Sequence, residues 1–273
     1  MIEFLKELLG YTFIVRALIV GVLVALCSAL LGVSLVLKRY SMIGDGLSHV
    51  GFGALAFAMA LNLAPLQVSI PIVLIAAFLL LRISESSKIK GDAAIALIST
   101  SALAIGVMIV SMTTGMNTDI CNYMFGSILA MSKSDVYLSV AVTVIVLILY
   151  VIFYNKIFAV TFDESFAKAT GTKSGFYNML IALLTALIIV VGMRMMGAML
   201  ISSLIIFPAL TSMRLFNSFK SVVISSVVLS VICFCVGIVI SFVYSTPTGA
   251  SVVIVNLVAF CLFSLLGLIK NKV

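Results

Sequence analysis

Nine long apolar runs fill most of this chain and constrain its fold more than any other feature. Crossing the hydrocarbon core of a bilayer takes about 20 consecutive apolar residues, so runs of this length are typical of transmembrane helices. Because 64% of the residues are hydrophobic and only 9% are charged, the composition excludes a water-soluble fold. We predict a single all-α transmembrane domain over residues 1–273, with spans near residues 12–37, 46–64, 66–82, 92–112, 135–154, 175–193, 198–213, 221–241 and 250–269.

The basic residues indicate how these spans are oriented. They fall on alternate loops, which the positive-inside rule assigns to the cytoplasmic side of the membrane. These residues are Lys38/Arg39, Arg82/Lys88/Lys90, Lys156/Lys168/Lys173, Arg214/Lys220 and Lys270/Lys272. Nine spans place the N-terminus outside. A count of eight stays open, because the runs 46–64 and 198–213 are interrupted by glycine or proline. The net charge of +7 then fits anionic lipid headgroups and does not indicate nucleic-acid binding.

Two segments are predicted not to span. Residues 1–11 mix charged and apolar side chains, which favours a short interfacial helix. Within residues 112–134, a polar stretch is followed by the apolar Phe125–Leu129, which is too short to cross. We expect an external loop with a re-entrant or surface half-helix there, an element that is tolerated where it packs on protein.

Some functions are excluded by what the sequence lacks. No G-x-x-x-x-G-K-[ST] phosphate-binding loop occurs, and the spans leave no room for a nucleotide-binding domain. If ATP is used, a separate chain must bind it. The five cysteines show no paired spacing, so we interpret them as packing residues without a disulfide framework.

Asp45 and His49 are the strongest candidates for chemistry, because ionisable groups inside spans are costly. At positions i and i+4 of a helix their side chains share one face, one turn apart. A carboxylate oxygen and an imidazole nitrogen at that spacing can hold one divalent cation. Oxygen and nitrogen donors without a thiolate suit zinc or manganese better than Cu(I) or magnesium. An alternative stays open, in which Asp45 caps the helix and His49, the only histidine, bonds a backbone carbonyl.

Two ligands make an incomplete metal site. A homodimer with twofold symmetry would complete it, because such an interface brings both copies of Asp45 and of His49 to the axis. We therefore expect a second copy of the chain as a partner.

A second candidate lies in residues 161–171 of the longest cytoplasmic loop. Thr161 and Glu164 have capping-box spacing, and Gly171 can supply a left-handed stop, which predicts a two-turn helix. A free helix this short is unstable in water, so its apolar side needs a surface. That surface is either the membrane and the protein's own helix ends or a groove on a soluble partner.

The third candidate is the run Gly197–Ala209. Pro208 frees a backbone carbonyl about one turn earlier, and Ser202 and Ser203 can bond the backbone or a neighbouring helix. The segment can line a moving gate, or it can serve packing alone.

Four motifs in order resemble bacterial zinc/manganese ABC transporter permeases of the ABC-3 type. Residues Lys38–His49 resemble the family signature R-x-S-L-x-G-D-A-L-S-H, with Gly46 where alanine is common. The missing methyl group at Gly46 is expected to widen the site slightly. The other motifs are Phe125–Leu129, the segment Asp163-Glu164-x-Phe166-Ala167 with Gly171, and Gly197–Ala209. The resemblance covers nearly the whole chain.

The resemblance implies a permease in two copies, without permanently bound cofactor, that carries Zn²⁺ or Mn²⁺. It implies two cytoplasmic ATPases, which use the ATP, and an extracellular metal-binding lipoprotein. Asp45 and His49 would line the metal path. Residues 161–171 would form the coupling helix, which docks the ATPase through Phe162, Asp163, Glu164, Phe166, Ala167 and Gly171. We favour zinc, because an imidazole suits a borderline-soft ion, with manganese or iron as the alternative.

Three other classes remain as alternatives. An organic micronutrient permease would not need Asp45 or His49. An ion-coupled secondary transporter usually has more buried carboxylates and inverted repeats, which we do not find. An intramembrane metalloprotease is disfavoured by the single histidine and the lack of an H-E-x-x-H motif. We expect a transport subunit that is not itself an enzyme.

Overall fold

The computed structural model describes residues 12–86, 91–113 and 133–270. The regular elements in these residues are all helices, as predicted. The expected interfacial helix 1–11 and most of the expected re-entrant segment 112–134, Phe125–Leu129 included, lie outside the described residues. The helices are α2 (Thr12–Leu37), α3 (Met42–Ala60), α4 (Pro65–Ser86), α5 (Gly91–Met112), α7 (Lys133–Phe162), α8 (Glu164–Ala169), α9 (Ser174–Met196), α10 (Ala198–Ser212), α11 (Phe219–Tyr244) and α12 (Thr248–Lys270).

Eight of the described helices are long and apolar enough to cross a membrane. The helix α10 is also apolar, but its 15 residues rise only about 22 Å, less than the hydrocarbon thickness of roughly 30 Å. It follows α9 after the single residue Gly197, whose φ of 84° is open to glycine and strained for other residues. The predicted bundle of eight to nine spans is therefore confirmed, with α10 as the short member.

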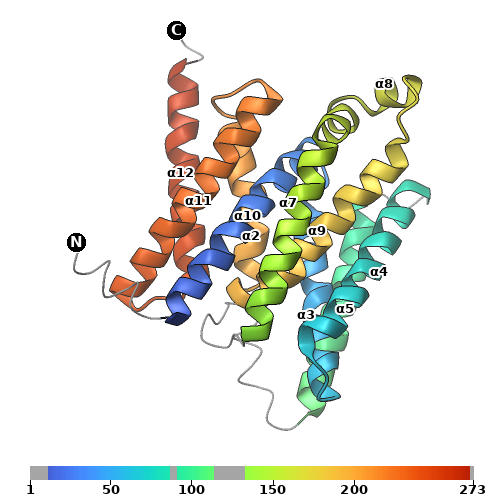
Figure 1. Cartoon of the computed structure of the whole chain (residues 1–273), viewed down its shortest axis with the longest axis vertical. Coiled ribbons are helices and arrows are strands. Elements are labelled where there is room, and N and C mark those ends of the chain that lie inside the picture. Colours follow the sequence, from blue (N-terminus) through green and yellow to red (C-terminus); the bar gives the residue numbers. More distant parts are fainter. Residues whose placement is uncertain (1–11, 87–90, 114–132, 271–273) are drawn as a thin grey trace.

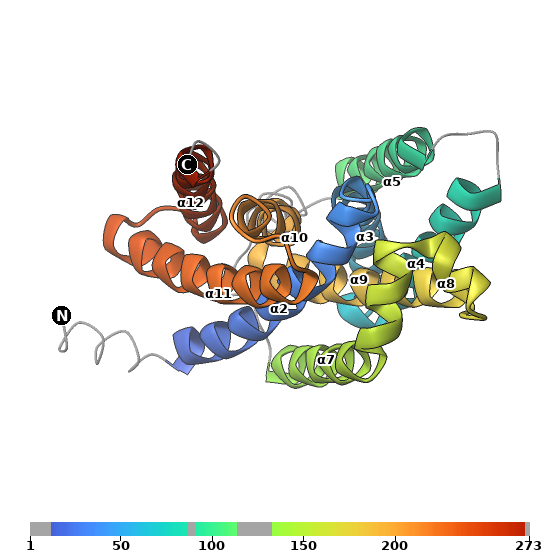
Figure 2. The ribbon, with the colours of Figure 1, turned by 90° about the horizontal axis from the view of Figure 1, so that it is seen from above.

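The helices differ strongly in how much of their surface is covered. In α3 and in α9, 72% of the most apolar stretch is buried, against 17% in α12. Seen from above, α2, α9 and α10 occupy the middle of the bundle, whereas α7 and α12 lie at its edges (Figure 2). Side chains from the central helices, such as Leu31, Ile188 and Leu204, are fully or almost fully buried. The central helices therefore form the core, and the outer ones present apolar side chains to lipid.

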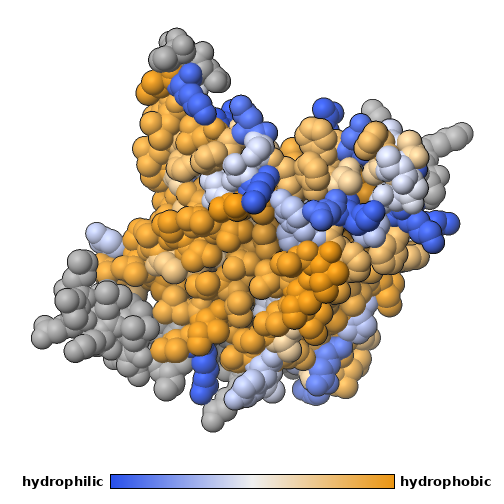
Figure 3. Space-filling model, turned by 45° about the horizontal axis from the view of Figure 1, so that its top comes forward, coloured by the Kyte–Doolittle hydropathy of each residue, from blue (hydrophilic) through white to orange (hydrophobic). Residues whose placement is uncertain are grey.

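Polar contacts show which helix ends lie together. Lys38, at the end of α2, pairs with Glu164 of α8 at 3.1 Å, and Lys270 of α12 donates to the carbonyl of Leu215 at 3.0 Å. In Figure 1, α8 and the end of α12 lie at the same end of the bundle. Figure 3 shows an apolar surface over the helices, with hydrophilic residues gathered mainly toward that end. By the positive-inside rule this end faces the cytoplasm.

Candidate functional site

Asp45 and His49 occupy the first two turns of α3. The helix begins at Met42, so the predicted i, i+4 relation holds, and a carboxylate oxygen of Asp45 lies 3.6 Å from Nε2 of His49. Between them, the Ser48 hydroxyl donates a hydrogen bond to the backbone carbonyl of Asp45 at 2.7 Å, within the same turn of α3. The N-cap position belongs to Ser41, so capping is not the role of the Asp45 side chain.

The separation of the two side chains suits one shared cation. It is longer than an ordinary hydrogen bond, whose donor and acceptor lie about 2.9 Å apart. Two metal bonds of about 2.1 Å at a tetrahedral angle place their donor atoms about 3.4 Å apart, close to the observed distance. A divalent ion can thus lie between the two groups with little movement of either side chain.

The helix α10 borders this pair. Ser202 of this helix lies near the Asp45 carboxylate, while its hydroxyl donates a hydrogen bond to the carbonyl of Ala198 at 3.2 Å. A Cβ atom added at Gly44 would lie 3.2 Å from the Ile205 side chain, so the two helices are close there. Ser202 is therefore the one predicted gate residue that the structure brings to the candidate metal site.

The other two predicted gate residues lie elsewhere. Ser203 is 6% exposed, and its hydroxyl finds no hydrogen-bond partner among the described residues. Pro208 is buried, and its carbonyl accepts a hydrogen bond from Ser226 of α11 at 3.2 Å. Pro208 thus links α10 to α11, and the gate role of Ser203 and Pro208 stays a prediction.

Gly46 acts on helix packing, which differs from the expectation that it widens the site. A Cβ atom at this position would lie 2.6 Å from Cγ2 of Ile95 in α5. A real Cβ contact is essentially never that short, so the missing methyl group lets α5 approach α3. The space next to Gly46 is filled by the side chain of Ile95.

The candidate site is incomplete within one chain. The side chain of Asp45 is 47% exposed and that of His49 is 27% exposed, although both belong to a helix that is otherwise mostly buried. Among the described residues there is no group of three or more His, Cys, Asp or Glu that could hold a metal ion. A charged group left on the outer face of a transmembrane helix is costly, so this face needs a cover.

The predicted helix in residues 161–171 is present, but it starts later than the capping-box spacing indicated. The helix α7 runs through Thr161 to Phe162, so Thr161 cannot cap. Asp163 is the N-cap of α8, and its side chain accepts a hydrogen bond from the backbone N–H of Phe166 at 2.9 Å. Gly171 has a φ of 82°, which confirms the predicted left-handed stop.

The end of α7 and the short helix α8 each turn one aromatic side chain away from the protein. Phe162 is 76% exposed and Phe166 is 65% exposed, whereas Ala167 is buried against the bundle. In Figure 1, α8 lies at the outer edge of the end that carries the basic residues. The predicted apolar side of this helix is thus left without a surface by the described part of the chain.

A polar cluster at this end was missed by the sequence analysis. Glu164 accepts hydrogen bonds from Lys168, from Lys38 and from the amide of Asn178 in α9. Burial raises the pKa of the Glu164 carboxyl, but these three hydrogen bonds outweigh it and lower the pKa to about 2. Lys38 and Glu164 are separated by 126 positions, so no local spacing signals their contact.

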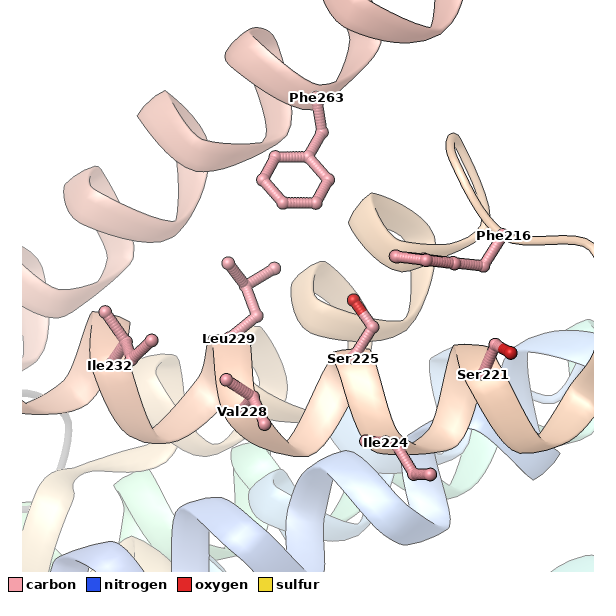
Figure 4. A pocket seen from close by; sticks show the side chains of 8 residues that line it. All are labelled: Phe216, Ser221, Ile224, Ser225, Val228, Leu229, Ile232 and Phe263. Atoms are coloured by element: carbon pink, nitrogen blue, oxygen red, sulfur yellow. The ribbon is translucent and has the colours of Figure 1, made fainter.

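A hollow between α11 and α12 differs from the Asp45/His49 site in its lining. It has a volume of about 440 Å³, and its lining is apolar apart from the hydroxyls of Ser221 and Ser225 (Figure 4). Phe263 of α12 closes it from one side, above Leu229 of α11. Without an ionisable group in its lining, this hollow offers nothing to a metal ion.

Comparison with known proteins agrees with this architecture. A chain of Streptococcus pneumoniae in the structure titled "PsaBC … in complex with Fab" superposes with a TM-score of 0.85 at 31% identity, covering 96% of this chain and 95% of that one. The manganese transport system membrane protein MntC of Halalkalibacterium halodurans is 27% identical over 95% of this chain and 89% of its own length. The high-affinity zinc uptake system membrane protein ZnuB of Haemophilus influenzae is 30% identical over 90% and 94%.

Family membership follows from a match of nearly full length. The model of the ABC 3 transport family matches residues 10–267. Together with eight membrane-crossing helices, the comparisons identify a multi-pass protein of the bacterial plasma membrane. This chain therefore belongs to the ABC 3 transport family.

Proposed function

We propose that this chain is the membrane-spanning permease subunit of an ATP-driven importer for divalent transition-metal ions. The observation that carries the proposal is the 3.6 Å separation between the Asp45 carboxylate and the His49 imidazole on one face of α3. Zinc and manganese are both candidate cargoes, because the oxygen and nitrogen donors suit either ion and relatives are named for either metal.

The partly exposed face of α3 that carries Asp45 and His49 supports a homodimer. A second copy around a twofold axis would cover Asp45 and His49 and add an identical pair, which gives four donor atoms in total. Four donors are enough for a tetrahedral site, and the lack of a third ligand within the described part of one chain is then accounted for. A site shared between two moving subunits also releases its ion readily, as transport requires.

The helix α8 supports docking of a cytoplasmic ATPase. The sequence has no phosphate-binding loop, so ATP hydrolysis belongs to another chain. Phe162 and Phe166 can enter an apolar groove on that chain, while the Asp163 cap and the Gly171 stop fix the ends of the helix. Glu164 and the buried Ala167 hold it on the bundle.

Transport would proceed by alternating access. An extracellular metal-binding lipoprotein would deliver the ion, and ATP-driven closure of the two ATPase subunits would pull the two α8 helices together. The spans would tilt and switch the Asp45/His49 site from outward to inward access. Ser202 of α10 lies near Asp45 of α3, so it would move with the Asp45 carboxylate during this change.

The test is ATP-dependent uptake of zinc and of manganese into proteoliposomes that contain this chain, its ATPase and its binding protein. We expect Asp45→Ala and His49→Ala each to reduce uptake by at least about 10- to 100-fold, which is the usual cost of removing even a hydrogen-bond partner of a metal ligand, with ATP hydrolysis retained. Phe57→Leu is the matched control, because Phe57 is an exposed residue of α3 two turns beyond His49. The ion that is taken up by the wild type decides between zinc and manganese.

Other outcomes identify other functions. Unchanged uptake in both variants would make the pair structural and would favour an organic micronutrient as cargo. Uptake that orthovanadate does not inhibit would indicate an ion-coupled secondary transporter.

A further inference from the structure

Lys38 is a lysine held almost out of solvent at the end of α2. Its side chain is 8% exposed, whereas the side chain of Lys168, which pairs with the same carboxylate, is 62% exposed. The ammonium group donates to Glu164 at 3.1 Å and to the side-chain oxygen of Asn178. The amide of Asn178 in turn donates to Glu164 at 3.2 Å. Three side chains, one directly after α2 and one each from α8 and α9, thus form a closed triangle.

The surroundings of Lys38 fix the position of its charge. Five of its apolar neighbours line the same small cavity, which has a volume of only about 10 Å³: Leu35, Tyr40, Ile43, Leu81 and Ile181. A buried ammonium group without partners is costly, so Lys38 depends on Glu164 and Asn178. Any displacement of Glu164 with α8 must therefore either carry Lys38 along or break the triangle.

A tight turn connects Lys38 to α3, the helix that carries Asp45 and His49. Arg39 has a φ of 61°, in the left-handed region, and the N–H of Tyr40 donates back to the carbonyl of Leu35 at 2.8 Å. The helix α3 begins at Met42, and Asp45 lies in its first turn. Only three residues separate Lys38 from the start of α3, so there is no slack loop between them.

The third corner of the triangle leads to the same site by another route. Asn178 lies in the first half of α9, and α9 is followed by Gly197 and then by α10. Ser202, one turn into α10, lies near the carboxylate of Asp45. Both elements that border the candidate metal site therefore lead back to Glu164 on α8.

We propose that Lys38 is a positioning residue that transmits the movement of α8 to the first turn of α3, with Glu164 and Asn178 as its two partners. The proposal rests on the proposed function for the identity of the cargo. It adds the path by which the ATPase side of the protein moves the ion site. When α8 moves, the triangle moves as a unit and shifts Asp45 and His49 through the turn 38–41.

The experiment compares Lys38→Met, Lys38→Arg and Lys156→Met in the complete transporter. Lys156→Met is the matched control, because Lys156 is an exposed lysine at the same end of the bundle. Movement of α3 is followed without any metal, by maleimide labelling of Met42→Cys in a background where the five natural cysteines are serine. Labelling rates are measured with and without vanadate-trapped nucleotide.

In the wild-type background we expect the labelling rate to change on nucleotide trapping. In Lys38→Met we expect this change to disappear and metal uptake to fall about tenfold, while co-purification with the ATPase and ATP hydrolysis stay within about twofold. Lys38→Arg keeps the charge and should recover most of the uptake, and Lys156→Met should behave as wild type.

Several results would overturn the proposal. These are a labelling change that persists in Lys38→Met, no labelling change in the wild type, or a loss of uptake in step with the loss of ATPase binding, which would indicate a purely structural role. If Lys38→Met does not assemble, Asn178→Leu decides by the same measurements, because it removes a corner of the triangle without removing either charge. Failure of the proposed function would give a different result. The transporter with Lys38 intact would then show the change in Met42→Cys labelling on nucleotide trapping but would take up neither zinc nor manganese.

Discussion

Asp135 in the first turn of α7 and Arg194 in the last turn of α9 form an ion pair of 3.0 Å, at the end of the bundle opposite α8. Their side chains are only 15% and 16% exposed. The pair therefore holds together two helices whose other ends meet α8. It ties α7 to α9 at the outer end of the bundle.

Loss of one partner of this pair should destabilise the protein. We expect Arg194→Met to lower the free energy of unfolding by about 3–5 kcal/mol, because it leaves a carboxylate in a buried setting without its cation. The double variant Asp135→Leu/Arg194→Met should lose less, because no charge stays buried. Thermal unfolding in detergent measures both. A double variant that is less stable than Arg194→Met would contradict this account.

Much of the fold follows from the sequence because lipid imposes a minimum length on every span. The differences lie at helix ends, where hydrophobicity is not the deciding force. The helix α3 ends at Ala60, before the apolar run 46–64 does. It stops there because Asn62 has a left-handed φ of 53° and Pro65 starts the next helix. The run 135–154 becomes the longer α7, which continues through Asn155 and Lys156 to Phe162.

The candidate site was predictable only where it depends on local geometry. The spacing of Asp45 and His49 fixes their relation in any helix, and the structure confirms it. The approach of Ser202 and the contacts of Lys38 depend on how distant helices pack. Lys38 lies 140 positions from Asn178, and in the sequence it looks like any other basic residue of a cytoplasmic loop.

The neighbouring serines of α10 should respond differently to the loss of their hydroxyls. Ser202→Ala removes a polar neighbour of Asp45, and we expect uptake to weaken by about fivefold, which corresponds to about 1 kcal/mol. Ser203→Ala removes a buried hydroxyl that has no partner among the described residues, so uptake and stability should not fall. Concentration-dependent uptake in proteoliposomes measures the difference. Equal effects of the two substitutions would argue against a role for Ser202 at the ion site.

The exposed aromatic side chain of Phe166 should contribute directly to ATPase docking. We expect Phe166→Ala to weaken association with the ATPase by about 2 kcal/mol, or about 30-fold in Kd, as for other aromatic residues at interface centres. Phe176→Ala is the control, because Phe176 is also exposed at this end of the bundle but belongs to α9. Titration of the detergent-solubilised permease with labelled ATPase gives both constants. Similar losses for the two variants would show that docking is not centred on α8.

The charge of Glu164 should stabilise the protein in a pH-dependent way. Its pKa is lowered from 4.5 to about 2 in the folded protein, because the hydrogen bonds from Lys168, Lys38 and Asn178 outweigh the effect of burial. Between these two values the unfolded chain binds a proton that the folded chain does not, so stability rises with pH across this window. The contribution is complete above pH 4.5 and is lost as the pH falls toward 2.

Comparison of the wild type with Glu164→Gln isolates this contribution, because every other carboxylate titrates in both proteins. We expect the wild type to melt at a higher temperature at pH 7, and the difference to shrink steadily between pH 4.5 and pH 2. The difference between the wild type and Lys156→Met should stay constant over the same range, because a lysine does not titrate there. A wild-type advantage over Glu164→Gln that does not change down to pH 2 would mean that the hydrogen bonds of Glu164, and not its charge, hold α8 to Lys38.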